Sequence, residues 1–486
     1  MFSQCNEKDN KIIREQYKDQ PCANLLCMLK DFVFKYERIS QKPFNSYWGT
    51  VKIKSGGGFL SVAANSLLSI LKASGIDTSH EESVDPMRHY YEMTLGDIAA
   101  FGECLNYSLR DHYLLVHYAD NIHWHNSVFG GRQDIWDIYD GLLRECRSSV
   151  IDLHDISYTC LPFPKFFNIG ETQDSSLAYV QELIACEMKK RSPLIEFSEK
   201  LDGSFIQIRY IGNNELNAGF LISTSGTLYT EVAHQLLDAI DWLNKHKNYK
   251  DVAFALDNCT IIYEWIDSRD PHVVNYDKKE YGLHLIGIRD TVNGRLYTYS
   301  TVEMIAKLYG LRSTVTYPIN LNIAICNMES TKAKEREGYV MRIGGNLLKL
   351  KSREYVQAMH NIENAKSFNF ILHCYIDGTL DDFIASLPDG FKDSARTAAR
   401  KIGSFEQIMS DRIHAEFAKI PPALNRKDAM LYINSINDRY GMIRESVRNK
   451  YLNRPVSVLF QENKSGDRKY IKESVMDNYF NFLEPK

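Results

Sequence analysis

Short apolar runs of β-type composition recur along the middle of the chain and stop near Tyr355. Runs of roughly four to eight residues that alternate or are wholly apolar, separated by polar turns, are typical of antiparallel strands. The runs cover residues 113–118, 149–153, 205–210, 220–223, 260–266, 283–288, 338–343 and 347–350. The pattern predicts a sheet-rich region in the middle of the chain.

Helical spacing of apolar residues dominates the two ends of the chain. Near the N-terminus we predict helices over residues 11–36 and 63–73, with a flexible break at 55–58 between them. One helix, residues 232–243, interrupts the sheet-rich region. After residue 355 the chain reads mainly as helices, with breaks at Asp389-Gly390 and Pro421-Pro422. We therefore predict an α+β protein with an N-terminal extension (1–105), a sheet-rich domain (106–355) and an all-helical C-terminal domain (356–486).

The composition is that of an ordinary globular protein. A formal net charge of -4 gives no global basic field, so contact with nucleic acid would need a local basic face. The ten cysteines include no C-x-x-C pair, which argues against a zinc site and against disulfides, and favours a reducing compartment. The N-terminus has no signal-peptide core, and no apolar run approaches the roughly 20 residues that span a bilayer. We expect a soluble, cytoplasmic monomer (in the host cytoplasm, if the source is viral) without membrane contact.

Residues 199–204, which read EKLDGS, form a polar segment that leads into the apolar strand 205–210. This segment would hold Lys200 beside a sheet, where loss of a proton would make its amine a nucleophile. Asp202 would fix the turn or reach a nucleotide sugar, and Gly203 would allow a close approach of the backbone. The alternative is a solvated β-turn with no chemistry.

A second segment contains Glu337-Gly338 and, after a strand, Lys349-x-Lys351. Because residues two apart in a strand face the same way, Lys349 and Lys351 would project together and suit phosphate groups. Glu337 opens an apolar strand and would offer oxygen ligands to a hard cation. The alternatives are a solvated strand face and an ordinary loop carboxylate.

Glu264 lies inside the wholly apolar run 260–266. A carboxylate in such a strand needs a partner or a chemical task, because its burial without one costs free energy. The alternative is an outward-facing charge on a half-exposed strand.

In chain order these segments resemble motifs I, III, IV and V of the covalent nucleotidyltransferase superfamily, which contains polynucleotide ligases and capping enzymes. Residues 145–147 (ECR) and 163–168 (FPKFFN), together with Lys351-Ser352 and Tyr355-Val356, are similar to the RNA ligase 1 family, the tRNA-repair ligases of T-even bacteriophages. The resemblance covers residues 113–355. It implies an antiparallel-sheet nucleotidyltransferase core, ATP and Mg²⁺ (or Mn²⁺) as cofactors, and RNA with 5′-phosphate and 3′-hydroxyl ends as partner, cleaved tRNA included.

The resemblance also implies a role for each matching residue. Lys200 would carry AMP, and Glu337, Lys349 and Lys351 would join it as catalytic residues. Glu264 would hold the ribose and, with Glu337, serve the metal. The ATP site would contain Arg147, Lys165, Glu199, Lys200, Asp202, Gly203, Glu264, Lys349 and Lys351. The C-terminal domain would select RNA, and a helix over its basic stretch 439–450 would place Arg444 and Arg448 on one face.

The chain departs from the family pattern in two places. Ser225, in Thr224-Ser225-Gly226-Thr227, stands where the family has a lysine, and Asp270-Pro271 stands where it usually has Asn-Arg. The alternative functions are a DNA ligase, a capping-type guanylyltransferase and a non-catalytic RNA-binding relative. A P-loop is absent, so no fused kinase is expected. His123 and His125 are interpreted as structural residues rather than half of a metal site.

Overall fold

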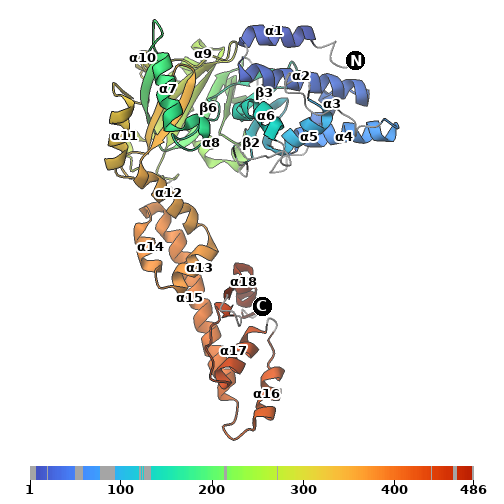
Figure 1. Ribbon diagram of the computed structural model, residues 1–486, viewed down its shortest axis with the longest axis vertical. Helices are drawn as coiled ribbons and strands as arrows, with labels where there is room; N and C mark the ends of the chain where they lie inside the picture. The colour runs from blue at the N-terminus through green and yellow to red at the C-terminus, as the bar shows by residue number, and fades with distance from the viewer. Residues whose placement is uncertain are drawn as a thin grey trace. The chain divides into compact units, whose positions relative to one another are not determined.

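The computed structural model describes residues 7–18, 20–49, 58–76, 93–119, 122, 124, 133–212, 216–270, 272–438, 441–462 and 468–483. The chain divides into two compact units, Met1–Arg353 and Glu354–Lys486. The first holds three four-stranded antiparallel sheets with helices around them, and the second is mainly helical (Figure 1). The predicted α+β class and the helical C-terminal region are confirmed. Most of the expected break at 55–58, and the residues His123, His125, Pro271 and Arg439, lie outside the described residues.

The N-terminal part of the first unit is a layer of helices. Its helices are α1 (Glu7–Tyr17), α2 (Pro21–Ser40), α3 (Asn45–Trp48), α4 (Phe59–Ala73) and α5 (Leu95–Glu103). The prediction of one helix over residues 11–36 was wrong. Pro21 has no N–H to donate to a preceding turn but fits the first position of a helix, so α1 ends and α2 begins around it.

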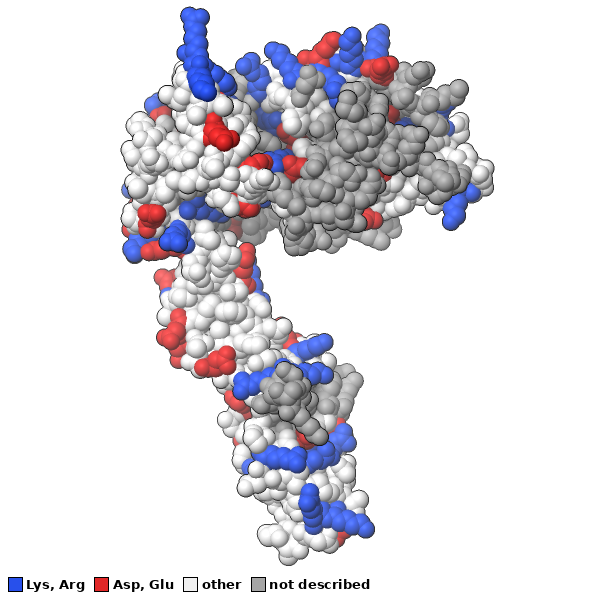
Figure 2. Space-filling view, viewed as in Figure 1, with Lys and Arg blue, Asp and Glu red and all other residues white. Residues whose placement is uncertain are grey.

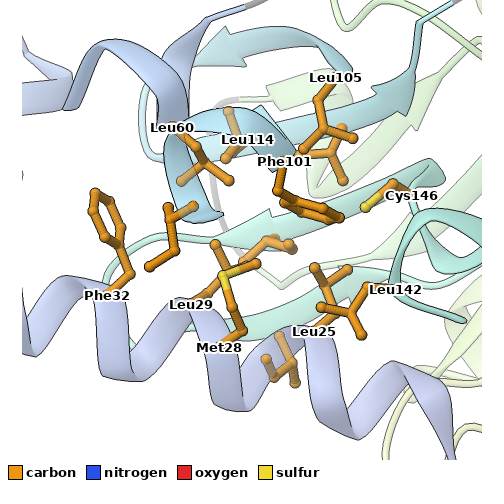
Figure 3. Packing of buried hydrophobic residues seen from close by; sticks show 14 of the residues in the cluster. Leu25, Met28, Leu29, Phe32, Leu60, Phe101, Leu105, Leu114, Leu142 and Cys146 are labelled. Atoms are coloured by element: carbon orange, nitrogen blue, oxygen red, sulfur yellow. The ribbon is translucent and has the colours of Figure 1, made fainter. Parts of the chain in front are cut away.

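These helices share one hydrophobic core with the first sheet. Side chains from α2, α4, α5, the later helix α6 (Gln133–Glu145) and two strands meet there (Figure 3), among them Leu25, Met28, Leu29, Phe32, Leu60, Phe101, Leu105, Leu114, Leu142 and Cys146. Tyr17 also donates a hydrogen bond from its hydroxyl to the Thr291 carbonyl at 2.6 Å, far along the chain. The described helices of the first hundred residues are therefore packed into the first unit.

The first sheet has the order β1-β2-β3-β4, with β1 (Leu105–Arg110), β2 (Tyr113–Tyr118), β3 (Arg147–Asp152) and β4 (Ser157–Cys160). Helix α6 (Gln133–Glu145) comes between β2 and β3. At its end, Glu145 pairs with Arg289 at 2.9 Å, and both side chains are fully buried. Arg289 also donates to the carbonyls of Pro162 and Gly294. This core ion pair fixes the chain two residues before Arg147.

The other two sheets contain most of the predicted strands. One has the order β10-β5-β11-β12, from β5 (Ile195–Lys200), β10 (Thr316–Tyr317), β11 (Gly338–Ile343) and β12 (Asn346–Lys351). The other has the order β7-β6-β8-β9, from β6 (Ser204–Tyr210), β7 (Phe220–Ser223), β8 (Cys259–Ile266) and β9 (Gly282–Asp290). Helices α7 (Leu177–Glu187), α8 (His234–Lys245), α9 (Asn248–Ala255), α10 (Tyr299–Tyr309) and α11 (Leu321–Ser330) connect the strands.

The chain crosses between these two sheets at residues 201–203, directly after Lys200. Lys200 was expected in a polar turn, but it is the last residue of β5 and pairs with Gly338 of β11. Strand β5 has the sequence IEFSEK, in which polar residues outnumber apolar ones, so its composition hid it from a search for apolar runs.

The second unit is built mainly from α12 (Arg353–Ala365), α13 (Phe368–Ile376), α14 (Leu380–Ser386), α15 (Asp389–Ala418), α16 (Arg426–Ser435), α17 (Met442–Tyr451) and α18 (Glu473–Leu483). A short hairpin, β13 (Phe460–Glu462) with β14 (Arg468–Tyr470), was not predicted. The break predicted at Asp389-Gly390 lies just before it, at Leu387-Pro388, and Asp389 opens α15, where a carboxylate suits the first turn. Pro421-Pro422 separates α15 from α16 as predicted.

The surface carries both signs of charge. On the face shown in Figure 2, described Lys and Arg side chains are interspersed with Asp and Glu over the first unit, which agrees with the small net charge. Among the helices that the structure describes, none is both long and apolar enough to cross a membrane.

Candidate active site

Three strands place two lysines on either side of a glycine. Gly338 of β11 is the pairing partner of Lys200 on β5 and of Lys351 on β12. Residues directly opposite each other in a sheet face the same side, so both lysines project from one face. Gly338 leaves the space between them free of a side chain, and a Cβ atom there would lie 2.1 Å from the Leu350 carbonyl oxygen. Any larger residue would displace the strand that carries Lys351.

Glu337, the residue before Gly338, lies between the two lysines. Its Oε2 is 2.8 Å from Lys200 Nζ, and its Oε1 is 3.0 Å from Lys351 Nζ. The carboxylate is only 3% exposed. The sequence placed Glu337 and the two lysines in one site as separate contributors, and the structure brings all three into direct contact. We call Lys200, Lys349 and Lys351 around Glu337 the lysine group.

Lys349 is the third cation of this group. Its Nζ lies 4.8 Å from the ring centre of Phe166, a cation–π contact. Burial, followed by the positive charges of Arg147 and Lys200, holds the pKa of Lys349 well below its usual range. One carboxylate faces several cations here, so the group has room for an added anion.

The pKa of Lys200 shifts in the opposite direction to that of Lys349. Burial alone would lower the pKa of Lys200, but the carboxylates of Glu337 and Glu264 outweigh burial and raise the pKa above its usual value. The proton therefore stays on Lys200 in the free protein. The amine becomes a nucleophile only when that interaction is weakened.

A cavity of about 400 Å³ opens beside Lys200. It is bounded by residues from all three sheets of the first unit, including Arg147, Phe166, Lys200, Glu264 and Lys349. Pockets of this size hold small organic ligands, and the mixture of aromatic, apolar and cationic walls suits a nucleotide. The sequence reasoning did not single out Phe166, although it lies in the segment 163–168 on which the family resemblance partly rests.

Glu264 lines the cavity from β8. Its Oε1 accepts the Gly203 N–H at 3.0 Å. Gly203 has to be a glycine for this approach, because a Cβ atom would lie 2.8 Å from the Glu264 side chain and 2.5 Å from the Trp265 carbonyl. Burial, and then the nearby charge of Glu337, raises the pKa of Glu264 to about 7, while Lys200 opposes the rise. Glu264 is therefore held by a specific partner within the site.

Asp202 is buried and organises a loop. Its Oδ2 accepts N–H groups from Val273 at 2.9 Å and Val274 at 3.0 Å. The Asp202 N–H also donates to the Tyr276 hydroxyl at 2.8 Å. Of the two roles considered for Asp202, these contacts favour fixing the local chain.

Arg147 and Lys165 occupy different surroundings. Arg147 lines the cavity and stacks over the Phe166 ring at 4.9 Å. Lys165 is not among the cavity-lining residues, and its Nζ lies between the rings of Tyr118 and Phe167 at 5.3 and 5.2 Å. Burial, with the charges of Arg147 and Lys351 among the further causes, lowers the pKa of Lys165. Lys165 therefore belongs to the same positive region, at its edge.

Glu199 lines the cavity and lies 3.4 Å from Arg336 Nε. Arg336 also donates to the hydroxyls of Tyr339 at 2.9 Å and Tyr317 at 2.8 Å. The sequence reasoning missed Arg336, and its position directly before Glu337 was the available signal. Arg336 connects the strand of Lys200 to the strand of Glu337.

Both departures from the family pattern lie near the site. Ser225 lines the cavity, and its carbonyl accepts the Ser148 hydroxyl at 2.8 Å, so no cation enters from this turn. Asp270 accepts the Ser204 hydroxyl and lies 3.4 Å from His272 Nε2. The hydrogen bond to His272 lowers the pKa of Asp270 to about 2. Asp270 thus forms an anionic link between β6 and its neighbouring loop.

The donor set near Lys200 fits a hard divalent cation. Glu337 and Glu264 supply oxygen ligands, and Mg²⁺ binds through one or two carboxylates while water and substrate phosphates complete its shell. Both oxygens of Glu337 contact lysines in the present arrangement, so a cation would have to replace at least one of those contacts.

Comparison with known proteins agrees with this geometry. Residues 145–370 match the family model described as RNA ligase, a segment that contains every site residue named above. The chain is also 25% identical over 308 residues to RNA ligase 1 of bacteriophage TS2126, covering 61% of this chain and 72% of the phage protein. These matches confirm the predicted resemblance to RNA ligases.

Solved structures of RNA ligases show a weaker likeness. An archaeal ATP-dependent RNA ligase is 17% identical, with a TM-score of 0.35, and covers 75% of this chain and 96% of its own. A Naegleria gruberi RNA ligase variant, solved with ATP and Mn, is 16% identical with a TM-score of 0.29. That match covers 37% of this chain and 54%, about half, of the Naegleria chain. These TM-scores are low, so the assignment rests on the family model and the phage relative.

Proposed function

We propose that the protein is an ATP-dependent RNA ligase in which Lys200 carries AMP as a covalent intermediate. The lysine group supports this most directly, because it places Lys200 in a cavity of nucleotide size beside two further lysines and a buried carboxylate. The family model and the phage relative add their printed descriptions, which name RNA ligases.

In the first step the Lys200 Nζ attacks the α-phosphorus of ATP. A P–N bond forms, the bond between the α-phosphorus and the bridging oxygen to the β-phosphate breaks, and pyrophosphate leaves. Lys200 has to lose its proton for this attack, and Glu337 at 2.8 Å is the group that retains it. When bound, Mg²⁺ or Mn²⁺ supplies positive charge at Glu337 and at the phosphate oxygens. Neutralisation of Glu337 would lower the pKa of Lys200, so nucleotide and metal binding would activate the amine.

Lys349, Lys351 and Arg147 stabilise the charge that develops on the phosphoryl oxygens. Loss of the Lys200 charge on adenylylation also frees one oxygen of Glu337, because a phosphoramidate nitrogen is not an ammonium group. AMP then passes to an RNA 5′-phosphate, and attack by an RNA 3′-hydroxyl on the activated end releases AMP and closes the phosphodiester bond. The family resemblance extends this proposal to cleaved tRNA as the natural substrate.

Label transfer tests the proposal. Protein is incubated with α-labelled ATP and Mg²⁺, separated on a denaturing gel, and then chased with a 5′-phosphorylated RNA. Wild type should carry the label and lose it to RNA, whereas Lys200→Ala should carry none. Labelling with GTP in place of ATP would support a capping-type enzyme, and transfer to DNA alone would support a DNA ligase.

A further inference from the structure

Two histidines and an aspartate gather at one end of the first sheet, away from the catalytic cavity. His112 lies in the two-residue turn between β1 and β2, Asp152 ends β3, and His154 lies in the turn between β3 and β4. One ligand atom from each of the three lies within 4.8 Å of the others. We call these residues the His112–Asp152–His154 cluster. Strand β3 runs from Arg147 at the cavity to Asp152, which separates the two places by about 16 Å at 3.3 Å per residue.

The backbone fixes the cluster before any ligand arrives. Asp152 is the pairing partner of Tyr113, and the Leu153 N–H donates to the His112 carbonyl at 2.9 Å. Asp152 Oδ1 accepts the His154 N–H at 2.8 Å, which holds the second turn against the carboxylate. The two histidine rings stack with centroids 4.0 Å apart. The backbone therefore holds the three residues close together, although they come from separate turns at this end of the sheet.

The ligand atoms, one from each residue, lie up to 4.8 Å apart, somewhat farther than ligands of one bound metal ion, and each histidine is nearest to a different oxygen of Asp152. His112 Nε2 lies 3.6 Å from Asp152 Oδ2, and His154 Nδ1 lies 3.6 Å from Asp152 Oδ1. These distances are too long for hydrogen bonds. Ligands around tetrahedral zinc, with bonds near 2.0 to 2.1 Å, stand about 3.3 Å apart. Small rotations of the half-buried His112 and the exposed His154 would bring the three groups to that spacing.

We propose that the His112–Asp152–His154 cluster binds one divalent transition-metal ion, with Zn²⁺ as the expected occupant. Two imidazoles and a carboxylate suit Zn²⁺, Co²⁺ or Ni²⁺ and suit Mg²⁺ poorly, because imidazole is the softer donor. Three protein ligands leave a fourth position for water. The bound ion joins the β1–β2 turn to the β3–β4 turn and clamps that end of the sheet. The absence of a C-x-x-C pair argued against a zinc site in the sequence, but these ligands come from two turns and include no cysteine.

The test titrates ZnCl₂ into metal-free, untagged full-length protein by calorimetry. The exposed thiols of Cys186 and Cys326 are changed to serine in every sample, so that they contribute no sites. The parent should bind one equivalent. His112→Gln, Asp152→Asn and His154→Gln should each weaken this binding by at least about 100-fold, since even loss of groups behind the ligands costs up to about that much. His154 is 59% exposed, so its substitution leaves the fold intact.

Controls separate this site from the catalytic one. His414→Gln, an exposed histidine of α15, should bind Zn²⁺ as the parent does. Lys200→Ala should also keep full zinc affinity, and His154→Gln should keep AMP labelling with Mg²⁺. In the parent, Co²⁺ should give the visible absorption of a tetrahedral site, and His154→Gln should abolish it. No stoichiometric Zn²⁺ binding by the parent, or equal affinities in the parent and the three cluster variants, would overturn the proposal.

Discussion

Two groups of buried charges in the first unit have opposite designs. The core ion pair joins one arginine, Arg289, to one carboxylate, Glu145, and Arg289 also donates to two backbone carbonyls. The lysine group sets a single buried carboxylate, Glu337, against two lysines in direct contact, with Lys349 nearby. The first group is closed and balanced, whereas the second carries excess positive charge and borders a cavity.

This difference separates a structural role from a chemical one. Burying a charge costs free energy that a matched, hydrogen-bonded partner offsets. The core ion pair satisfies that condition within the protein. The lysine group does not satisfy it: burial, and then repulsion from Arg147 and Lys200, hold the pKa of Lys349 well below its usual range. An anionic ligand such as a triphosphate would supply the missing negative charge.

The largest expected effect is a loss of stability when the core ion pair is broken. Arg289→Met leaves Glu145 buried without its partner and should lower the free energy of unfolding by about 3 to 5 kcal/mol. Urea denaturation followed by circular dichroism measures this loss. The double variant Arg289→Met with Glu145→Gln should recover much of the stability, because no unpaired charge remains.

AMP labelling per folded molecule should change little in that double variant at a temperature where it is folded. A complete loss of labelling there would show that the core ion pair positions Arg147 for catalysis, and the division between the two groups would fail.

Substitutions in the lysine group should slow catalysis and leave the free energy of unfolding nearly unchanged. Lys349→Ala and Lys351→Ala should each reduce RNA sealing by about 100- to 1,000-fold, the range for loss of a group that stabilises developing charge. Thermal unfolding should show that both variants remain folded. Lys307→Ala, an exposed lysine of α10 paired with Glu303, is the matched control and should seal normally. Sealing at the wild-type rate by both the Lys349→Ala and the Lys351→Ala variants would favour a merely solvated strand face.

The difference in stability between wild type and Glu264→Gln should depend on pH. Its pKa is raised from 4.5 to about 7, so the folded protein binds this proton more tightly than the unfolded chain does. The resulting stability is present at low pH and is lost as the pH rises through about 7. The thermal unfolding midpoint of wild type minus that of Glu264→Gln should therefore decrease as the pH rises from about 5 to about 8. A constant difference across that range would show that Glu264 is ionised throughout.

The smallest effect on AMP transfer is expected from the C-terminal unit. Motifs I, III, IV and V end at Lys351, and the similarity to the RNA ligase 1 family around motif V extends to Tyr355-Val356, so a version ending near Ala358 should keep labelling within about threefold, as a separately folded domain would. Sealing of a nicked tRNA stem-loop should fall more than sealing of an unstructured RNA. Equal losses on the two RNAs would reject a selective role for this unit.

The arginines first considered for RNA binding in that unit already have partners. Arg444 donates to the Asp438 carbonyl at 3.1 Å, and Arg448 donates to Asn434 at 2.9 Å and pairs with Glu445. They are spaced on α17 as the helical pattern predicts, but these contacts favour a structural role for both. Spacing indicates which residues share a helix face and does not show what that face contacts.

Local patterns predicted the strands of Glu264 and Lys349, because apolar runs and short motifs lie within one element. The contacts of Lys200 and Lys351 with Glu337 could be predicted from the sequence only in part, because they depend on how β5, β11 and β12 pair. Gly338 was noticed as part of a motif, but its role as the gap between two lysines follows from register. The polar strand β5 and the zinc-type cluster were missed because neither leaves a periodic or contiguous signal.

The most direct test of the account is to map the site of AMP attachment. Wild-type protein is incubated with ATP and Mg²⁺, digested, and analysed by mass spectrometry before and after mild acid, which cleaves a P–N bond. The account predicts AMP on the peptide that contains Lys200, and its loss after acid treatment. AMP on Lys349 or Lys351 instead, or an acid-stable adduct on any residue, would contradict the assignment of Lys200 as the nucleophile.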